Sequence, residues 1–90
     1  MKYFDWNEEK NDILKKERNI SFEKIVIQIE LGKLLDVLEH PNWKKYKSQK
    51  LFMIEYENYA YLVPFVEEDD VIFLKTIIPS RKATKKYLGV

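Results

Sequence analysis

The start of the chain has a short strand pattern followed by a helical one. Residues 3–6 (YFDW) follow the two-residue period of a strand. Asn7 or Asp5 can cap a following helix that continues to about Arg18, with acidic residues in its first turn. Asn19 suits the left-handed position that ends such a helix. We therefore expect a strand and then a helix before residue 20.

A second helix follows, and one of its faces is apolar. Ser21 can cap it, Ile20 and Ile25 are spaced for a hydrophobic staple, and Gly32 ends it. Apolar side chains recur at the helical spacing i, i+3, i+4, i+7 at Phe22, Ile25, Val26 and Ile29. This face is expected to pack on a sheet, against Phe52, Ile54, Leu62, Phe73 and Ile77.

The rest of the chain is mostly β. Strands are predicted at residues 34–39, 51–57, 59–66 and 71–78, with the polar stretch 40–49 interrupted by Pro41 as a long loop. Ser80, after Pro79, can cap a short C-terminal helix. The order β-α-α-β-β-β-β-α predicts an α+β fold, with two N-terminal helices packed on an antiparallel sheet.

Length and composition limit the kind of protein. Ninety residues with 46% hydrophobic side chains suffice for one small domain over residues 1–90. The chain has no cysteine and one histidine, which argues against a disulfide scaffold or a structural zinc site. No uncharged apolar stretch approaches the roughly 18 residues of a membrane span. The acidic N-terminus does not resemble a secretory signal, so we expect a soluble cytoplasmic protein without membrane partner, metal or cofactor.

Charge is segregated along the chain although the total is only +1. Residues 1–39 carry a net charge of −2, residues 40–54 of +4, residues 55–70 of −6 and residues 71–90 of +5. If folding brings the two basic segments together, they form one electropositive surface that suits a nucleic acid. The alternative is two ordinary solvated faces.

Aromatic residues lie among the lysines of these basic segments. Lysines can contact phosphates while aromatic rings stack on bases, a combination typical of single-strand binding. The candidate RNA-binding residues are Trp43, Lys44, Lys45, Tyr46, Lys47, Lys82, Lys85 and Lys86. The aromatic residues of the loop could equally anchor it on the sheet.

Three short segments resemble BrnT-type toxins of bacterial toxin–antitoxin systems, in the same order and spacing along essentially the whole chain. Residues 6–11 (WNEEKN) resemble the family's W-D/N-x-x-K-N opening, residues 20–23 (ISFE) its V/I-S-F-E step, and residues 78–84 (IPSRKAT) its I-S-x-R-x-A segment. The resemblance implies a RelE-like fold and a ribonuclease that stops translation, held inactive by a cognate antitoxin. It points most directly to Arg81, which matches the closing arginine.

The chain departs from the family at Gln49 and Lys50, where an arginine is usual, and in its lysine-rich loop. These departures leave open a divergent member that binds RNA or an antitoxin without fast cleavage. A third possibility is an interaction protein whose basic face docks an acidic partner. The expected partners are RNA, including mRNA on the ribosome, and an antitoxin protein.

Metal-free RNA cleavage uses the 2′-hydroxyl of the RNA itself and needs a base, cations around the phosphate and an acid for the leaving oxygen. His40 is the best-tuned acid or base, because imidazole titrates near neutrality. Lys50, Lys75 and Arg81 can supply cations, and Tyr87 can donate a proton or stack on a base. These five residues are the candidate catalytic set of a metal-independent endoribonuclease.

Each of these assignments has a structural alternative. A lone histidine such as His40 is more often a surface or capping residue, and Arg81 could pair with a surface carboxylate. The acidic pair Glu8 and Glu9 and the acidic run 67–70 fit helix-start and turn positions better than a metal site or a general base.

Overall fold

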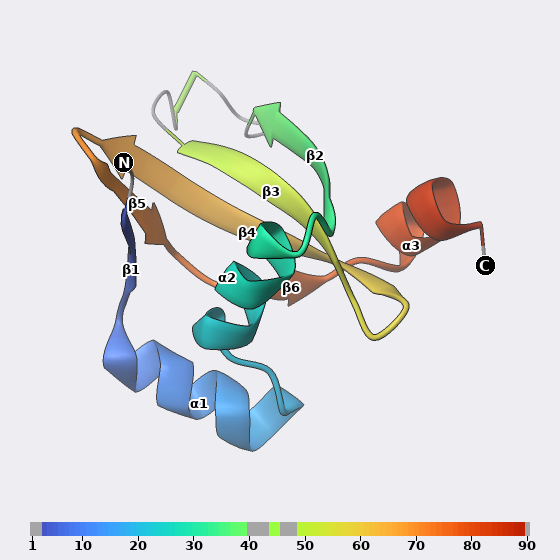
Figure 1. The fold of residues 1–90 in the computed structure, drawn as a ribbon, viewed down its shortest axis with the longest axis horizontal. Coiled ribbons are helices and arrows are strands. Elements are labelled where there is room, and N and C mark those ends of the chain that lie inside the picture. Colours follow the sequence, from blue (N-terminus) through green and yellow to red (C-terminus); the bar gives the residue numbers. More distant parts are fainter. Residues whose placement is uncertain (1–2, 40–43, 46–48, 90) are drawn as a thin grey trace.

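The computed structural model describes residues 3–39, 44–45 and 49–89. Three helices and six strands make up this part of the chain (Figure 1). In chain order they are β1 (Tyr3–Trp6), α1 (Glu8–Arg18), α2 (Phe22–Glu30), β2 (Leu34–Glu39), β3 (Gln49–Tyr56), β4 (Tyr59–Glu68), β5 (Val71–Leu74), β6 (Ile78–Pro79) and α3 (Arg81–Leu88). The fold is α+β, as the sequence predicts.

The strands form one sheet in the order β1-β5-β4-β3-β2, with β6 paired to β4. Neighbouring strands run antiparallel except β1, which pairs with β5 in parallel. The sheet is therefore mixed, whereas the sequence analysis predicted an antiparallel one. The N-terminal strand lies at one edge and β2 at the other, and both helices of the N-terminal segment lie between them in the chain.

The predicted strand over residues 71–78 is split in two by the structure. β5 ends at Leu74, opposite Trp6, because β1 ends there and Asn7 begins the cap of α1. The chain then leaves β5, and Ile78–Pro79 forms β6 against Tyr61 and Leu62 of β4. This detour places the start of α3 beside β4, where the Ser80 N–H donates to the Ala60 carbonyl at 3.0 Å.

The α1–α2 junction is held by side chains that bond to backbone groups. Asn7 caps α1 by accepting from the Lys10 N–H at 3.0 Å, and Asn19 ends the helix in the left-handed region at φ 53°. Ser21 caps α2 by accepting from the Lys24 N–H at 3.2 Å. Ile20 and Ile25 are both buried, as a hydrophobic staple requires. The predicted caps are confirmed.

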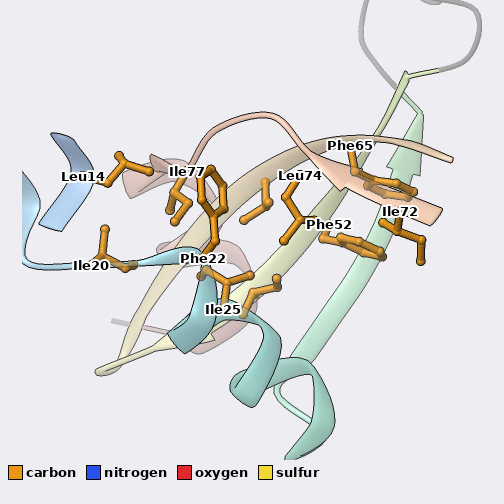
Figure 2. Close-up of a cluster of buried hydrophobic side chains, with 11 residues drawn as sticks. Leu14, Ile20, Phe22, Ile25, Phe52, Phe65, Ile72, Leu74 and Ile77 are labelled. Carbon is orange, nitrogen blue, oxygen red and sulfur yellow. The ribbon is translucent and has the colours of Figure 1, made fainter. Parts of the chain in front are cut away.

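One side of the sheet, the core face, carries the main hydrophobic cluster against α1 and α2. Figure 2 shows this cluster, to which α1 contributes Leu14 and α2 contributes Phe22 and Ile25. The sheet contributes Phe52, Ile54, Val63, Phe65, Ile72 and Leu74. The Phe52 and Phe65 rings stack with centroids 3.9 Å apart. Ile20 and Ile77 complete the cluster, and the Ile77 carbonyl accepts from Arg18 Nη1 at 2.9 Å.

Two residues predicted for this face point to the other one. The cluster does not contain Leu62 or Phe73. It contains their sequence neighbours Val63, Ile72 and Leu74. Side chains alternate between the two faces of a strand, so an assignment that is off by one residue moves a side chain to the opposite face. Leu62 packs instead with the second cluster of Met53, Ala60 and Ala83 under α3.

The opposite side of the sheet, the outer face, is covered by α3 over part of its area. Ser80 caps α3 by accepting from the Ala83 N–H at 3.1 Å. The buried Thr84 hydroxyl donates to the Ser80 carbonyl at 2.8 Å and accepts from the Ala60 N–H at 2.9 Å. The first turns of α3 are therefore fixed to β4. In Figure 1 this helix lies at one end of the sheet, away from the β4–β5 turn.

Candidate nucleic-acid interface

A hollow of about 320 Å³ lies between α3 and the outer face of the sheet. Its floor is apolar and is formed by Leu38 of β2, Leu51 and Met53 of β3, and Leu62 of β4. Lys82, Lys86 and Tyr87 of α3 lie around it. An apolar floor beside two exposed cations suits a ligand that has a flat apolar part and a negative charge.

The cations of α3 fall into two pairs because the helix repeats every three to four residues. Lys82 and Lys86 lie one turn apart and line the hollow, whereas Arg81 and Lys85 lie on the neighbouring edge and do not line it. All four side chains are exposed. Within the described part of the chain, no hydrogen bond or ion pair engages the Arg81 guanidinium, so the surface ion pair considered for it is not formed there.

Tyr87 lies at the mouth of the hollow and is held in place by β2. Its hydroxyl donates to Asp36 Oδ2 at 2.8 Å, and Lys86 Nζ lies 5.4 Å from the ring centroid. The hydrogen bond to Asp36 raises the pKa of the Tyr87 phenol above its usual value of 10.0, and desolvation and the Asp36 charge add to this. The phenol therefore keeps its proton at neutral pH.

Asp36 is a residue of this site that the sequence analysis missed. It lies in the edge strand β2, and its Oδ1 accepts from the Val37 N–H at 2.8 Å while Oδ2 accepts from Tyr87. Both oxygens of the carboxylate are thus bonded and the group has a fixed orientation. The sequence does show that Asp36 is a charged residue within the mostly apolar strand Leu34–Glu39. It gives no indication that Asp36 contacts Tyr87, which follows 51 positions later.

Two further predicted catalytic lysines are not brought to this hollow. Lys50 pairs with Glu39 and Phe65 across the sheet and shares the core face with Phe52 by strand alternation. Arg81 and Lys50 therefore belong to opposite sides of the sheet, and the two basic segments do not converge at Lys50. The reason is that successive side chains of a strand point to opposite faces of the sheet. A count of charges along the chain does not show on which face each charge lies.

Lys75 lies on the outer face but at a second hollow, of about 490 Å³, over β4 and β5. Val66 and Phe73 form part of its lining, and Glu68 and Asp69 bring negative charge to it. The Lys75 ammonium lies 5.9 Å from the centroid of the Phe73 ring. This lysine is exposed at the end of β5, which explains how a charged residue follows so apolar a strand.

The long loop is only partly described. Lys44 and Lys45 are exposed and form a turn. His40, Trp43, Tyr46 and Lys47 lie outside the described residues, so their predicted roles stay predictions. β3 begins after this loop at Gln49, opposite Val66 near the end of β4, whereas α3 begins beside Ala60 near the start of β4.

Over residues 3–39, 44–45 and 49–89, no three side chains of the types that bind metals are grouped as a metal site. None of the helices described has both the length and the apolar character needed to cross a membrane.

Comparisons with known proteins find no matching family model, no matching curated protein and no matching solved structure.

Proposed function

We propose that this protein is a BrnT-type toxin with a RelE-like fold, an endoribonuclease that cleaves RNA without a metal and so inhibits translation. The proposal is supported by the three segments that resemble this family in order and spacing. The observation that carries it is the hollow under α3, where an apolar floor lies beside Lys82 and Lys86. Its natural partner is a cognate antitoxin, and its place of action is the cytoplasm.

RNA would bind with its backbone along α3 and a base over the apolar floor. Lysine ammonium groups neutralise phosphates, and the release of counterions from the RNA drives binding. A base that stacks on the Tyr87 ring or packs on Leu51 and Met53 is removed from water. Every base has a flat face that can make such a contact, so this binding depends little on the RNA sequence. This arrangement requires an unpaired base, so single-stranded RNA, including mRNA on the ribosome, is the expected substrate.

Arg81 is the cation best suited to the cleavage step. Its guanidinium has no partner among the described residues, and it lies in the first turn of α3, beside Lys82. A guanidinium can hold a phosphate through two parallel hydrogen bonds and stabilise the charge that develops on it in the transition state. The match of Arg81 to the closing arginine of the family supports the same role.

The alternative function is a non-catalytic RNA- or protein-binding module of a toxin–antitoxin or regulatory complex. A specific observation favours it: Lys50 and Lys75, two of the predicted catalytic cations, lie away from the hollow under α3. Binding would then use the lysines of α3 without the full set of groups that cleavage needs. The two functions differ in one measurable quantity, the rate of RNA cleavage.

The test is to express the protein with and without the product of the neighbouring gene and to score growth. Purified protein is then incubated with single-stranded RNA in EDTA, and the products are separated on a gel. The toxin function predicts growth arrest that the neighbouring product reverses, and cleavage that persists in EDTA and is lost in Arg81→Ala. Binding without cleavage, in a protein that does not arrest growth, would support the alternative.

A further inference from the structure

Asp36 and Tyr87 form a hydrogen-bonded pair at the edge of the hollow under α3. Tyr87 Oη donates to Asp36 Oδ2 at 2.8 Å, and Asp36 Oδ1 accepts from the Val37 N–H at 2.8 Å. Asp36 is half-buried, opposite Met53 of β3. Both oxygens of the carboxylate are engaged, so it faces the phenol in one orientation.

The bond between Tyr87 and Asp36 joins the second half of α3 to β2. The first half of the helix is already fixed to β4 through the buried Thr84 hydroxyl and the Ser80 backbone. The Asp36 bond also fixes the hydroxyl of a residue that lines the hollow, next to the ammonium group of Lys86. It gives the Tyr87 hydroxyl a fixed direction at the edge of the hollow.

A phenol at this position is a poor base unless a second group takes its proton. The hydrogen bond to Asp36 raises the pKa of Tyr87, so a phenolate does not form at neutral pH. The phenol oxygen nevertheless keeps lone pairs that can accept a proton from a ribose hydroxyl. That acceptance becomes feasible when the proton already on the oxygen passes to the carboxylate bonded to it.

We infer that Asp36 is a positioning residue that receives the Tyr87 proton while Tyr87 takes the proton of the 2′-hydroxyl during RNA cleavage, an inference that rests on the proposed ribonuclease function. In this step the 2′-oxygen forms a bond to phosphorus and the bond from phosphorus to the 5′-oxygen breaks. The 5′-oxygen leaves with a proton from water. The products are a 2′,3′-cyclic phosphate and a 5′-hydroxyl, and Asp36 afterwards returns its proton through Tyr87 to the solvent.

The experiment compares the full-length parent with Asp36→Asn and Asp5→Asn. An Asn at position 36 can still accept from the Tyr87 hydroxyl but cannot take its proton, so kcat should fall by roughly 10²-fold with KM unchanged. Asp5 is a matched control because its Oδ1 also accepts from the N–H of the next residue, Trp6, at 2.8 Å, and because it is exposed with no tyrosine bonded to it. Asp5→Asn should cleave at the parental rate.

A second readout does not depend on activity. The pKa of the Tyr87 phenol is followed by NMR in protein with labelled tyrosine rings, with Tyr87→Phe used to assign the signal. Asp36→Asn should lower this pKa, because the negative charge beside the phenol is gone.

The outcomes separate the inference from the function on which it rests. An Asp36→Asn variant that keeps the parental kcat overturns the inference and leaves the ribonuclease function standing. A loss of cleavage that comes with a raised KM or a lower melting temperature shows that Asp36 only supports the structure, and also overturns it. A parent that cleaves no RNA overturns both the inference and the proposed ribonuclease.

Discussion

Asn11 Nδ2, on α1, donates a hydrogen bond of 2.6 Å to Glu23 Oε1 in the first turn of α2. The same Asn11 side chain accepts from the Phe22 N–H at 2.8 Å through its Oδ1, and it is fully buried. The amide therefore joins the middle of α1 to the start of α2 and satisfies a backbone donor that the helix leaves free. Asn11 lies in the segment 6–11 and Glu23 in the segment 20–23, so these two short segments contact each other in the fold.

Replacing Asn11 with alanine should destabilise the fold. The Phe22 N–H would remain buried without an acceptor, which costs about 1–3 kcal/mol of unfolding free energy. Asp12→Ala is the control, because the neighbouring Asp12 is exposed and should change stability by less than about 0.5 kcal/mol. Urea denaturation measures both values. Equal stability of the two variants would show that the Asn11 bridge contributes nothing.

Glu23 makes stability depend on pH in a predictable direction. The hydrogen bond from Asn11, followed by smaller contributions that include the Lys15 charge, lowers the pKa of Glu23 in the folded state below its usual value of 4.5. Stability from this carboxylate is therefore fully present above pH 4.5 and is lost as the pH falls through the lowered pKa. Glu23→Gln should be less stable than the parent at neutral pH, and the gap should close as the pH falls below 4.5. A gap that stays constant over this range in urea denaturation would contradict the assignment.

Helix ends were predictable from the sequence, and the face to which each strand residue points was less so. The caps at Asn7, Ser21 and Ser80 follow from side chains that bond to nearby backbone groups, so local sequence suffices for them. The face to which Leu62 and Phe73 point depends on the strand register, because a shift of one residue moves a side chain to the opposite face of the sheet. The end of β5 at Leu74 depended on its partner β1, which is about 70 residues earlier in the chain.

Helix α2 offers a direct test of which side chains form the core. Ile25 is fully buried, whereas Ile27, two residues later on the same helix, is 51% exposed. Ile25→Ala should lower the unfolding free energy by about 2–4 kcal/mol, since it removes packed side-chain atoms and leaves a cavity. Ile27→Ala should change it by under about 0.5 kcal/mol. Comparable losses in the two variants would mean that α2 does not pack on the sheet in this orientation.

Only part of the candidate site could be read from the sequence. The charge runs correctly indicate that the C-terminal helix presents exposed lysines, because no acid interrupts that segment. They do not separate Lys82, which lines the hollow, from Arg81, which does not, nor place Lys50 on the other side of the sheet. Asp36 escaped notice because its contact with Tyr87 exists only once α3 folds across β2.

Arg81 provides a test of the family resemblance. Arg81→Lys keeps the charge but loses the two parallel hydrogen bonds that a guanidinium makes to a phosphate. We expect most of the RNA cleavage and growth arrest to be lost with the melting temperature unchanged, because no described residue bonds to this side chain. Lys16→Ala on α1 is the control and should remain fully active. An Arg81→Lys variant as active as the parent would remove Arg81 from the site.

RNA binding by α3, the central claim, is tested most directly by the salt dependence of the protein's affinity for a labelled single-stranded RNA. The RNA is made uncleavable by 2′-O-methylation. Lys82→Ala/Lys86→Ala is compared with Lys16→Ala/Lys33→Ala, which removes the same charge from exposed positions outside the hollow. The slope of log affinity against log salt should become shallower by about 0.7 per lost phosphate contact, about 1.4 for the α3 pair, and stay parental in the control. Identical affinities and slopes in the parent and both variants would contradict the claim.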